Sequence, residues 1–188
     1  MTDFKLACRC GEVRGRLTSM YAFFNNHLVC YCDDCQTFAR HLDAQASALD
    51  AYGGTAIVQV SPCQVHLDAG ADQLRCLRLT SRGVTRWFTG CCNTPVANTV
   101  SAGLPFNGIV AAFIDEPDTA RGPVRYRIQG QHAVNSPPDM KIAKAFPRLM
   151  MLAIGLQILI ARIAGRQKPS PFYGSDQKPV NKPDILNA

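Results

Sequence analysis

Several signatures of nucleotide-dependent enzymes are missing from this chain of 188 residues. It has no glycine-rich phosphate loop, no dinucleotide-binding glycine pattern and no Ser/His/Asp arrangement, which argues against nucleotide-dependent chemistry. The basic and apolar start of a secretory signal is also lacking, because residues 1–6 carry Asp3 and Lys5 and lead directly into Cys8. We therefore expect a cytoplasmic protein.

Acidic residues are scarce in the C-terminal third. The chain has 20 Lys and Arg against 14 Asp and Glu, a net charge of +6. Residues 1–120 hold 9 basic and 11 acidic side chains, whereas residues 121–188 hold 11 and 3. A basic end can bind nucleic acid, an anionic membrane surface or an anionic small molecule, and it can equally serve solubility.

Long hydrophobic runs are also lacking. The apolar stretch 149–161 has 13 residues, too short for a transmembrane span. The composition changes after Pro137-Pro138, and residues 139–165 predict a helix with a narrow polar stripe that Pro147 kinks or divides. This helix has three open roles: packing on the core, forming a homo-oligomer interface, or lying on a membrane surface as a peripheral contact.

Short β segments separated by turn residues dominate the middle of the chain. Extended segments are predicted at 55–60, 73–80, 84–88, 107–114 and 124–128. A short helix is predicted within Asp33–Leu49. We expect a mainly β domain over residues 1–135, followed by a C-terminal helix and an extended basic tail over residues 136–188.

Cysteine, in contrast, is abundant. In a reducing compartment, nine cysteines are better explained as metal ligands and buried thiols than as disulfides. Three tight groups stand out, at positions 8–10, 30–35 and 91–92. Cys63 and Cys76 have no paired spacing and are expected to be core thiols.

The first and last groups predict a structural zinc site. Cys8 and Cys10, followed by Gly11, form a hook that needs two further ligands to saturate zinc. The loop with Cys91 and Cys92 is the natural supplier, and such a site would staple the first strand to a late one. Whether Cys91 is a ligand stays open, as does the alternative of buried cysteines without metal.

The middle group predicts a different kind of site. Cys30, Cys32 and Cys35 place three thiolates within six residues, and three ligands with an open position are typical of catalytic zinc. His27 and His41 lie near enough in sequence to complete a closed, structural site instead. Three thiolates leave the zinc site negatively charged, which suits exchange with an incoming thiol better than strong activation of water.

The order of these motifs resembles that of the glutathione-dependent formaldehyde-activating enzyme family, which includes centromere protein V. The resemblance runs from C-x-C-G through C-x-C-x-x-C to Arg-x-Phe and Cys-x-Thr-Pro, over about residues 6–97. It implies a Mss4-like zinc-binding fold of small antiparallel sheets, with two zinc ions. Structural zinc would map onto Cys8, Cys10 and Cys92, and catalytic zinc onto Cys30, Cys32 and Cys35. The implied reaction is addition of glutathione to formaldehyde to give S-(hydroxymethyl)glutathione.

The chain departs from the family pattern at the last group. Thr89 stands at the first cysteine position and Asn93 at the glycine, so the paired cysteines have become adjacent. The Asp33-Asp34 pair beside the middle group would repel an anionic substrate. Arg82 and Arg86 could meet a glutathione carboxylate, although a solvated strand edge explains them equally well.

Two functions of different classes follow. The first is a zinc-dependent carbon–sulfur lyase-like protein, with glutathione or another small thiol as its partner and an aldehyde adduct of that thiol as substrate. The second is a non-catalytic zinc-binding module that binds a partner, a membrane surface or nucleic acid through its basic C-terminal helix. Nucleic acid is the least expected of these partners.

Overall fold

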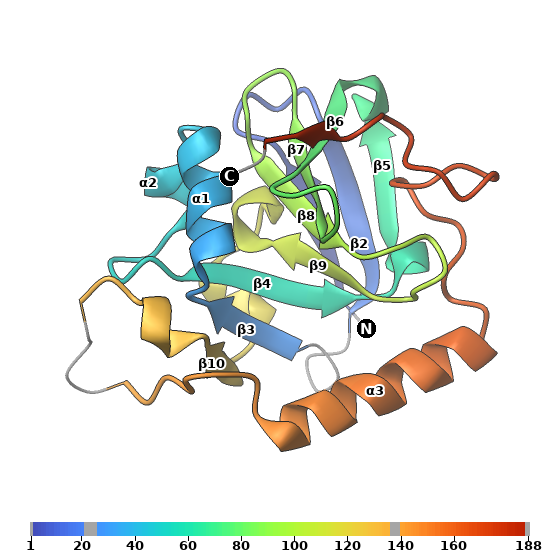
Figure 1. Cartoon of the computed structure of the whole chain (residues 1–188). Coiled ribbons are helices and arrows are strands. Elements are labelled where there is room, and N and C mark those ends of the chain that lie inside the picture. The colour runs from blue at the N-terminus through green and yellow to red at the C-terminus, as the bar shows by residue number, and fades with distance from the viewer. Residues whose placement is uncertain (1, 21–25, 136–139, 187–188) are drawn as a thin grey trace.

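The computed structural model describes residues 2–20, 26–135 and 140–186. Two sheets and few helices make the fold mainly β, with one longer helix near the C-terminus (Figure 1). The predicted fold class is therefore confirmed. The predicted division between residues 135 and 136 adjoins Pro137-Pro138, which lies outside the described residues, and it stays a prediction.

The smaller sheet has three antiparallel strands in the order β1-β2-β5. They are β1 (Thr2–Ala7), β2 (Arg14–Met20) and β5 (Val65–Ala69). The turn between β1 and β2 contains Gly11 at φ +75°, a backbone region that glycine enters without steric cost. That turn carries the first cysteine group.

The larger sheet has eight strands and forms most of the core. In spatial order they are β10 (Tyr126–Ile128), β3 (Asn26–Cys30), β4 (Thr55–Val60), β9 (Asn107–Val110), β8 (Pro95–Thr99), β7 (Thr85–Thr89), β6 (Leu74–Arg78) and β11 (Asp184–Ile185). The inner pairs are antiparallel, whereas β10–β3 and β11–β6 are parallel. The two edge strands of this sheet, β10 and β11, are thus short and come from the later part of the chain.

Short helices fill the connections. The segment predicted as a helix within Asp33–Leu49 forms two, α1 (Asp33–His41) and α2 (Gln45–Ala48). Single 3-10 turns lie at η1 (Pro62–Gln64), η2 (Ala71–Gln73), η3 (Ala111–Phe113), η4 (Asp118–Arg121) and η5 (Gly130–His132). The amphipathic α1 buries Cys35 and Phe38 against the larger sheet, which fixes the middle cysteine group.

Trp87 lies at the centre of the main core and is fully buried. Its indole N–H donates to the Thr99 hydroxyl at 2.9 Å, so the polar edge of the ring is satisfied. Phe172 packs against it at 5.1 Å between ring centroids and is also fully buried. The segment after the last helix therefore contributes directly to the core.

The C-terminal helix, α3 (Arg148–Ile163), is shorter than the sequence predicts. The prediction that Pro147 kinks or divides a helix spanning 139–165 is wrong: Pro147 has extended dihedral angles, φ −61° and ψ 136°, and the helix begins after it. Proline lacks an N–H and its ring clashes with a preceding helical turn, so it favours a helix start. Within the described part of the chain, no helix combines the length and apolar character needed to cross a bilayer.

Two candidate metal centres

Two groups of cysteines come together in the fold, and their membership follows the sequence prediction. One contains Cys8, Cys10, Cys91 and Cys92, and the other contains Cys30, Cys32 and Cys35. Within each group all sulfur atoms lie within 4.8 Å of one another. We call them the four-cysteine cluster and the three-cysteine cluster.

The four-cysteine cluster joins two turns that are distant in sequence. Cys8 and Cys10 lie in the β1–β2 turn, and Cys91 and Cys92 lie in the β7–β8 turn. The Sγ atoms of Cys8 and Cys10 are 3.5 Å apart, and those of Cys10 and Cys91 are 3.4 Å apart. Cys91 Sγ lies 3.8 Å from both Cys8 Sγ and Cys92 Sγ.

These distances fit four sulfur ligands around one ion. A tetrahedral site with metal–sulfur bonds of about 2.3 Å requires sulfur–sulfur separations of about 3.8 Å. A disulfide requires about 2.05 Å, and all nine cysteines are free thiols. The cluster can therefore hold a metal ion, with Cys91 in position to be the fourth ligand.

The β7–β8 turn explains how adjacent cysteines can face one site. Side chains of neighbouring residues in a strand point to opposite faces. Here the chain turns tightly, because the Asn93 N–H donates to the Thr89 carbonyl at 2.8 Å and the Thr89 N–H donates to the Thr94 carbonyl at 3.0 Å. Asn93 adopts φ +55°, a left-handed conformation that asparagine tolerates. Both Cys91 and Cys92 lie within this turn, which directs their sulfur atoms together.

Two threonine hydroxyls surround Cys92. Thr89 Oγ1 lies 3.4 Å and Thr94 Oγ1 lies 3.2 Å from its sulfur atom. Burial opposes ionisation, but the hydroxyls outweigh it and lower the pKa of Cys92 to about 5. Arg9 links the two turns as well, because its backbone N–H donates to Thr94 Oγ1 at 3.0 Å. The turns are thus joined by hydrogen bonds as well as by sulfur atoms.

The three-cysteine cluster is local in sequence. Cys30 ends β3, Cys32 is the N-cap residue of α1, and Cys35 lies in the first turn of that helix, where its N–H donates to the Cys32 carbonyl at 3.1 Å. Cys30 and Cys35 are buried, whereas Cys32 is half-buried. The sulfur atoms lie at the positive end of the helix dipole, which favours thiolates.

No fourth His, Cys, Asp or Glu of the described residues joins this cluster. His27 lies on β3 with Nδ1 3.0 Å from the Gly122 carbonyl oxygen, and His41 lies in the last turn of α1, at the opposite end from Cys35. The alternative in which either histidine completes a closed site is therefore wrong.

Arg86 on β7 is the buried cation of the three-cysteine cluster. Its side chain is 5% exposed, and Nη1 lies 3.7 Å from Cys35 Sγ and 3.3 Å from Asn98 Oδ1. Nη2 donates to Asp34 Oδ2 at 3.2 Å. The guanidinium also lies over the Phe38 ring, 5.6 Å from its centroid. The interpretation of Arg86 as part of a solvated strand edge is wrong, whereas Arg82 is exposed.

Arg86 and the neighbouring thiols determine where negative charge resides. Hydrogen bonds from Cys30 and Cys32, together with the nearby guanidinium, hold the pKa of Cys35 well below its usual value despite burial. Hydrogen bonds with Cys32 and Cys35, together with burial, raise the pKa of Cys30, and the pKa of Cys32 is raised as well. Without metal the cluster therefore favours one thiolate, on Cys35.

The acidic pair beside the cluster is neutralised. Asp34 pairs with Arg86 at 3.2 Å, and Asp33 pairs with Arg40 of the same helix at 3.4 Å. The predicted repulsion of anionic substrates by these two carboxylates is thus offset by two arginines.

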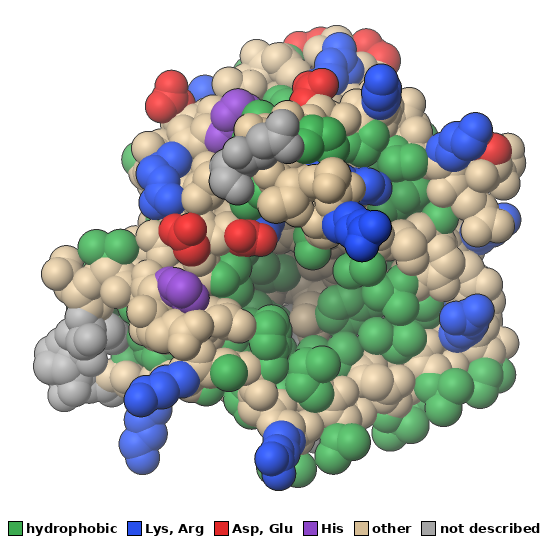
Figure 2. Space-filling view, in the orientation of Figure 1, with side chains coloured by type: hydrophobic (Ala, Val, Ile, Leu, Met, Phe, Trp, Pro, Cys, Tyr) green, Lys and Arg blue, Asp and Glu red, His purple; other side chains and the backbone are tan. Residues whose placement is uncertain are grey.

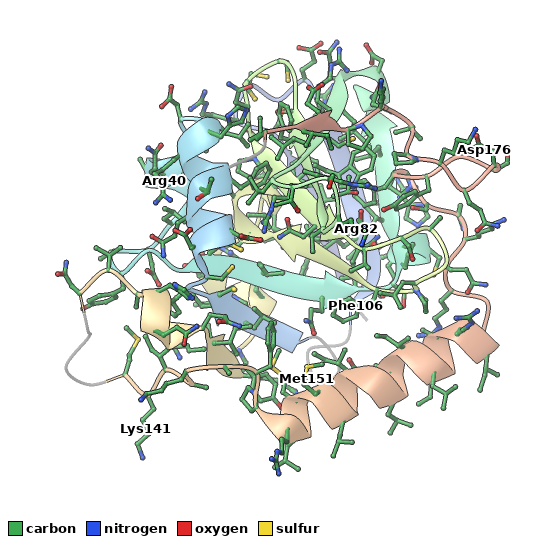
Figure 3. All side chains as sticks on the ribbon, in the orientation of Figure 1. Arg40, Arg82, Phe106, Lys141, Met151 and Asp176 are labelled. Carbon is green, nitrogen blue, oxygen red and sulfur yellow. The ribbon has the colours of Figure 1, made fainter. Side chains whose placement is uncertain are left out.

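The surface is hollowed beside the start of α1, above β4 (Figure 2). Arg82, labelled in Figure 3, lies on the loop between β6 and β7 across from α1. On the buried side, a cavity of about 10 Å³ is lined by Cys35, Phe38 and Arg86 among others, which is room for one water molecule. This cavity is too small for a larger molecule, and the half-buried Cys32 is the most exposed of the three cysteines.

The remaining cysteines lie outside both clusters. Cys76 is buried in the main core, and its thiol donates to the Asn181 carbonyl at 3.2 Å. Cys63 is half-buried in η1. Asn98 is the contributor that the sequence does not reveal, and Arg86 is predicted there only as a contact for a glutathione carboxylate. A pairing between β7 and β8 brings the two residues together, and no local motif marks it.

Comparison with known proteins places the chain in one family. No curated protein sequence matches it. A crystal structure of a Rhodobacter sphaeroides protein, from Northeast Structural Genomics, is similar at 16% sequence identity and a TM-score of 0.46, over 64% of this chain and 96% of that one. The family of unknown function DUF6151 matches residues 2–184, which include both cysteine clusters and α3. The chain belongs to the DUF6151 family.

Proposed function

We propose that the protein is a zinc-dependent carbon–sulfur lyase-like enzyme that acts on the adduct of an aldehyde with a small thiol such as glutathione. The observation that carries the proposal is the unequal size of the two clusters. Four sulfur ligands saturate a tetrahedral ion, whereas three leave a position for a substrate atom. One chain thus contains both a closed and an open sulfur site.

The donor set supports zinc. Clusters made only of cysteine sulfur favour soft or borderline metals, and tetrahedral sulfur sites are typical of zinc or iron–sulfur centres. Nine cysteines without a disulfide are typical of a reducing environment, so we place the protein in the cytoplasm as part of this proposal.

Cys30, Cys32 and Cys35 would hold the working zinc ion. Bound there, zinc would supply the Lewis acidity that stabilises a small thiol as its thiolate. In the addition, the substrate sulfur forms a bond to the carbonyl carbon and the carbonyl π electrons move to oxygen. The proton lost by the thiol ends on that oxygen, and the reverse reaction releases thiol and aldehyde.

The protein's own residues would prepare this site. Arg86 and the start of α1 stabilise negative charge on Cys35. This residue is therefore already favoured as a thiolate, the form that binds a metal cation. Paired with arginines, Asp33 and Asp34 no longer present two uncompensated charges to an anionic thiol. Cys32 is half-buried, whereas Cys30 and Cys35 are buried, so Cys32 is the ligand most accessible to a substrate. The order of motifs that resembles formaldehyde-activating enzymes supports the choice of substrate class.

Metal analysis and an activity assay test the proposal together. Protein purified without chelator should contain close to two zinc ions per chain, one for each cluster. With glutathione and formaldehyde, it should accelerate formation or breakdown of S-(hydroxymethyl)glutathione, measured by NMR exchange spectroscopy.

Cys32→Ser should lose one zinc ion and this acceleration, whereas Cys63→Ser should keep both, because Cys63 belongs to neither cluster. A zinc content near zero would overturn the whole proposal. Full zinc content without acceleration for any small thiol would overturn the enzymatic part.

A further inference from the structure

The outward face of α3 is apolar and uncovered. Five residues form a stripe along it, with exposed fractions of 78% for Leu149, 70% for Leu152, 58% for Leu156, 55% for Leu159 and 80% for Ile163. Their spacing of three and four residues places them on one side of the helix. We call these five residues the outer stripe; Figure 2 shows hydrophobic side chains along the lower edge of the molecule, where α3 lies in Figure 1.

The opposite face of α3 is already in use. Met150 and Ile154 are buried and pack against a cluster that includes Leu28, Ile57 and Ile128 of the larger sheet. The helix is therefore fixed to the domain by one face, and the outer stripe cannot turn inward without breaking that packing. Partners for the outer stripe have to come from outside the described chain.

The charges around α3 have a single sign. Residues 140–175 contain no Asp or Glu, and their six cations are Lys141, Lys144, Arg148, Arg162, Arg166 and Lys168. All six side chains are exposed. Arg148 and Arg162 lie fourteen residues apart on one flank of the helix, between its buried face and the outer stripe. The exposed apolar surface is thus bordered by uncompensated positive charge.

We propose that α3 docks on an anionic membrane surface, with its axis parallel to the bilayer. The outer stripe would enter the boundary between headgroups and acyl chains, and the flanking cations would contact anionic headgroups. Interfacial helices combine these two features, and each basic residue near an anionic leaflet adds attraction. Long basic side chains can also keep their charged ends in the headgroup region while their stems contact apolar surface.

A second copy of the chain fits this face less well. Two α3 helices packed along the outer stripe would bring Arg148 and Arg162 beside arginines of the other copy, and residues 140–175 offer no acidic side chain to pair with them. The stripe also spans only about two heptads, shorter than a stable coiled coil requires. Anionic lipid satisfies both the apolar surface and the charge.

The inner face of α3 packs in the same cluster as Cys30 and Cys35. Docking through the outer stripe would therefore hold the three-cysteine cluster on the membrane-facing side of the domain. Met151, labelled in Figure 3, lies on this helix and is itself 51% exposed. This inference does not depend on the catalytic proposal, because it rests on the surface of α3 alone.

Vesicle co-sedimentation of the full chain tests the proposal. The protein should sediment with vesicles that contain phosphatidylserine and far less with vesicles of phosphatidylcholine alone, and the difference should shrink at high salt. A variant with Leu152→Ser, Leu156→Ser and Leu159→Ser should bind the anionic vesicles at least about 100-fold more weakly. Arg148→Gln with Arg162→Gln should weaken binding about tenfold.

Val100→Ser is the matched control, because Val100 is 54% exposed and lies outside α3. It should bind as the wild type does. The proposal is overturned if the wild type stays in the supernatant with anionic vesicles, or if it binds both vesicle types equally. It is also overturned if the leucine variant binds vesicles as the wild type does and light scattering shows that the wild type is a dimer but the leucine variant a monomer.

Discussion

The four-cysteine and three-cysteine clusters contain the same ligand atoms but are built by different parts of the chain. In the first, Cys10 and Cys91 are separated by 81 residues and belong to turns of different sheets. In the second, all three cysteines lie within one strand end and one helix start. Joining distant segments restricts the unfolded chain much more than joining neighbours. A metal in the four-cysteine cluster should therefore stabilise the fold. A metal in the three-cysteine cluster should contribute less to folding and can take part in a reaction.

The two clusters also differ in the charge of the groups beside their sulfur atoms. The neutral hydroxyl groups of Thr89 and Thr94 lie beside Cys92 of the four-cysteine cluster, and the Arg9 guanidinium there donates to the Cys92 carbonyl, not to a sulfur atom. The three-cysteine cluster has a buried guanidinium, Arg86, and an N-terminal helix turn. A charge placed beside a ligand sulfur alters its electronic properties, while neutral hydrogen bonds chiefly fix its position. Four predictions can test this contrast.

The largest difference should appear in stability after removal of one ligand from each cluster. Cys10→Ser opens the link between the two sheets and should lower the free energy of unfolding by about 4 kcal/mol, which is about 12 °C in Tm. Cys32→Ser should cost about 1 kcal/mol. Calorimetry of metal-loaded protein measures both. Equal Tm losses for the two variants would break the contrast between a structural and a working cluster.

Arg86→Met should act on the three-cysteine cluster only. Removing the buried cation leaves Cys35 and Asp34 without their partner, and we expect metal affinity to fall about 10- to 100-fold at this cluster. Competition with a chromophoric chelator measures the two sites separately. Arg86→Lys should restore part of the loss, because it keeps the charge but not the forked geometry.

Arg75→Met on the neighbouring strand is the control. Its guanidinium donates to the backbone carbonyls of Asp72 and Leu74 and touches neither cluster. Loss of metal from the four-cysteine cluster in Arg86→Met would show that the two clusters are coupled.

Thr89→Val should weaken the four-cysteine cluster by a smaller amount. The hydroxyl lies 3.4 Å from Cys92 Sγ and accepts the Thr94 N–H at 3.1 Å, so its loss leaves a buried donor unpaired. We expect a cost of about 1 kcal/mol, or about 3 °C in Tm. Thr119→Val, at an exposed position in η4, should leave Tm unchanged. An unchanged Tm in Thr89→Val would remove the positioning role of this hydroxyl.

The smallest effect concerns pH and Tyr31, which lies between Cys30 and Cys32. Burial, with Asp50 nearby, raises the pKa of Tyr31 to about 12 from 10.0. The unfolded chain therefore loses this proton at lower pH than the folded one, so stability is present below pH 10 and falls as pH rises towards 12. Between about pH 9 and pH 11, Tm should fall by a few degrees more in the wild type than in Tyr31→Phe.

Tyr52→Phe, at a half-buried position in the following turn, is the control for this measurement and should behave as the wild type does. Parallel pH curves for wild type and Tyr31→Phe would show that burial and the hydrogen bond from Tyr31 to Asp50, 3.1 Å long, do not raise the pKa of Tyr31 on folding.

The cysteine clusters could be predicted because their ligands come in short, paired spacings. The sequence leaves open whether Cys91 is a ligand, and one backbone feature accounts for the position of its sulfur in the cluster: Asn93 at φ +55° reverses the chain directly after the pair. Such turn geometry is not marked by Cys-Cys itself. The mainly β class was predicted for a similar reason, since segments such as Thr55–Val60 show their strand character locally and match β4 at both ends.

Other features depend on long-range register, which no local pattern reveals. Arg86 meets Cys35 only because β7 lies between β6 and β8 and faces α1, and it pairs with Asn98 across the sheet. β8 itself begins with Pro95, a residue that normally argues against a strand but is allowed at its first position. Pro147 was interpreted as a kink because the apolar pattern continues on both sides of it, and periodicity alone cannot show where a helix begins.

Phe172 makes completion of the core depend on a late part of the chain. It fills the space beside Trp87, and Asn181 then donates to the Leu74 carbonyl at 2.5 Å, so the last part of the chain finishes a core begun by the first. A ribosome-bound chain that has not yet released these residues has most of its strands but an uncovered indole. The single tryptophan is thus a built-in fluorescent reporter of the moment at which the domain closes.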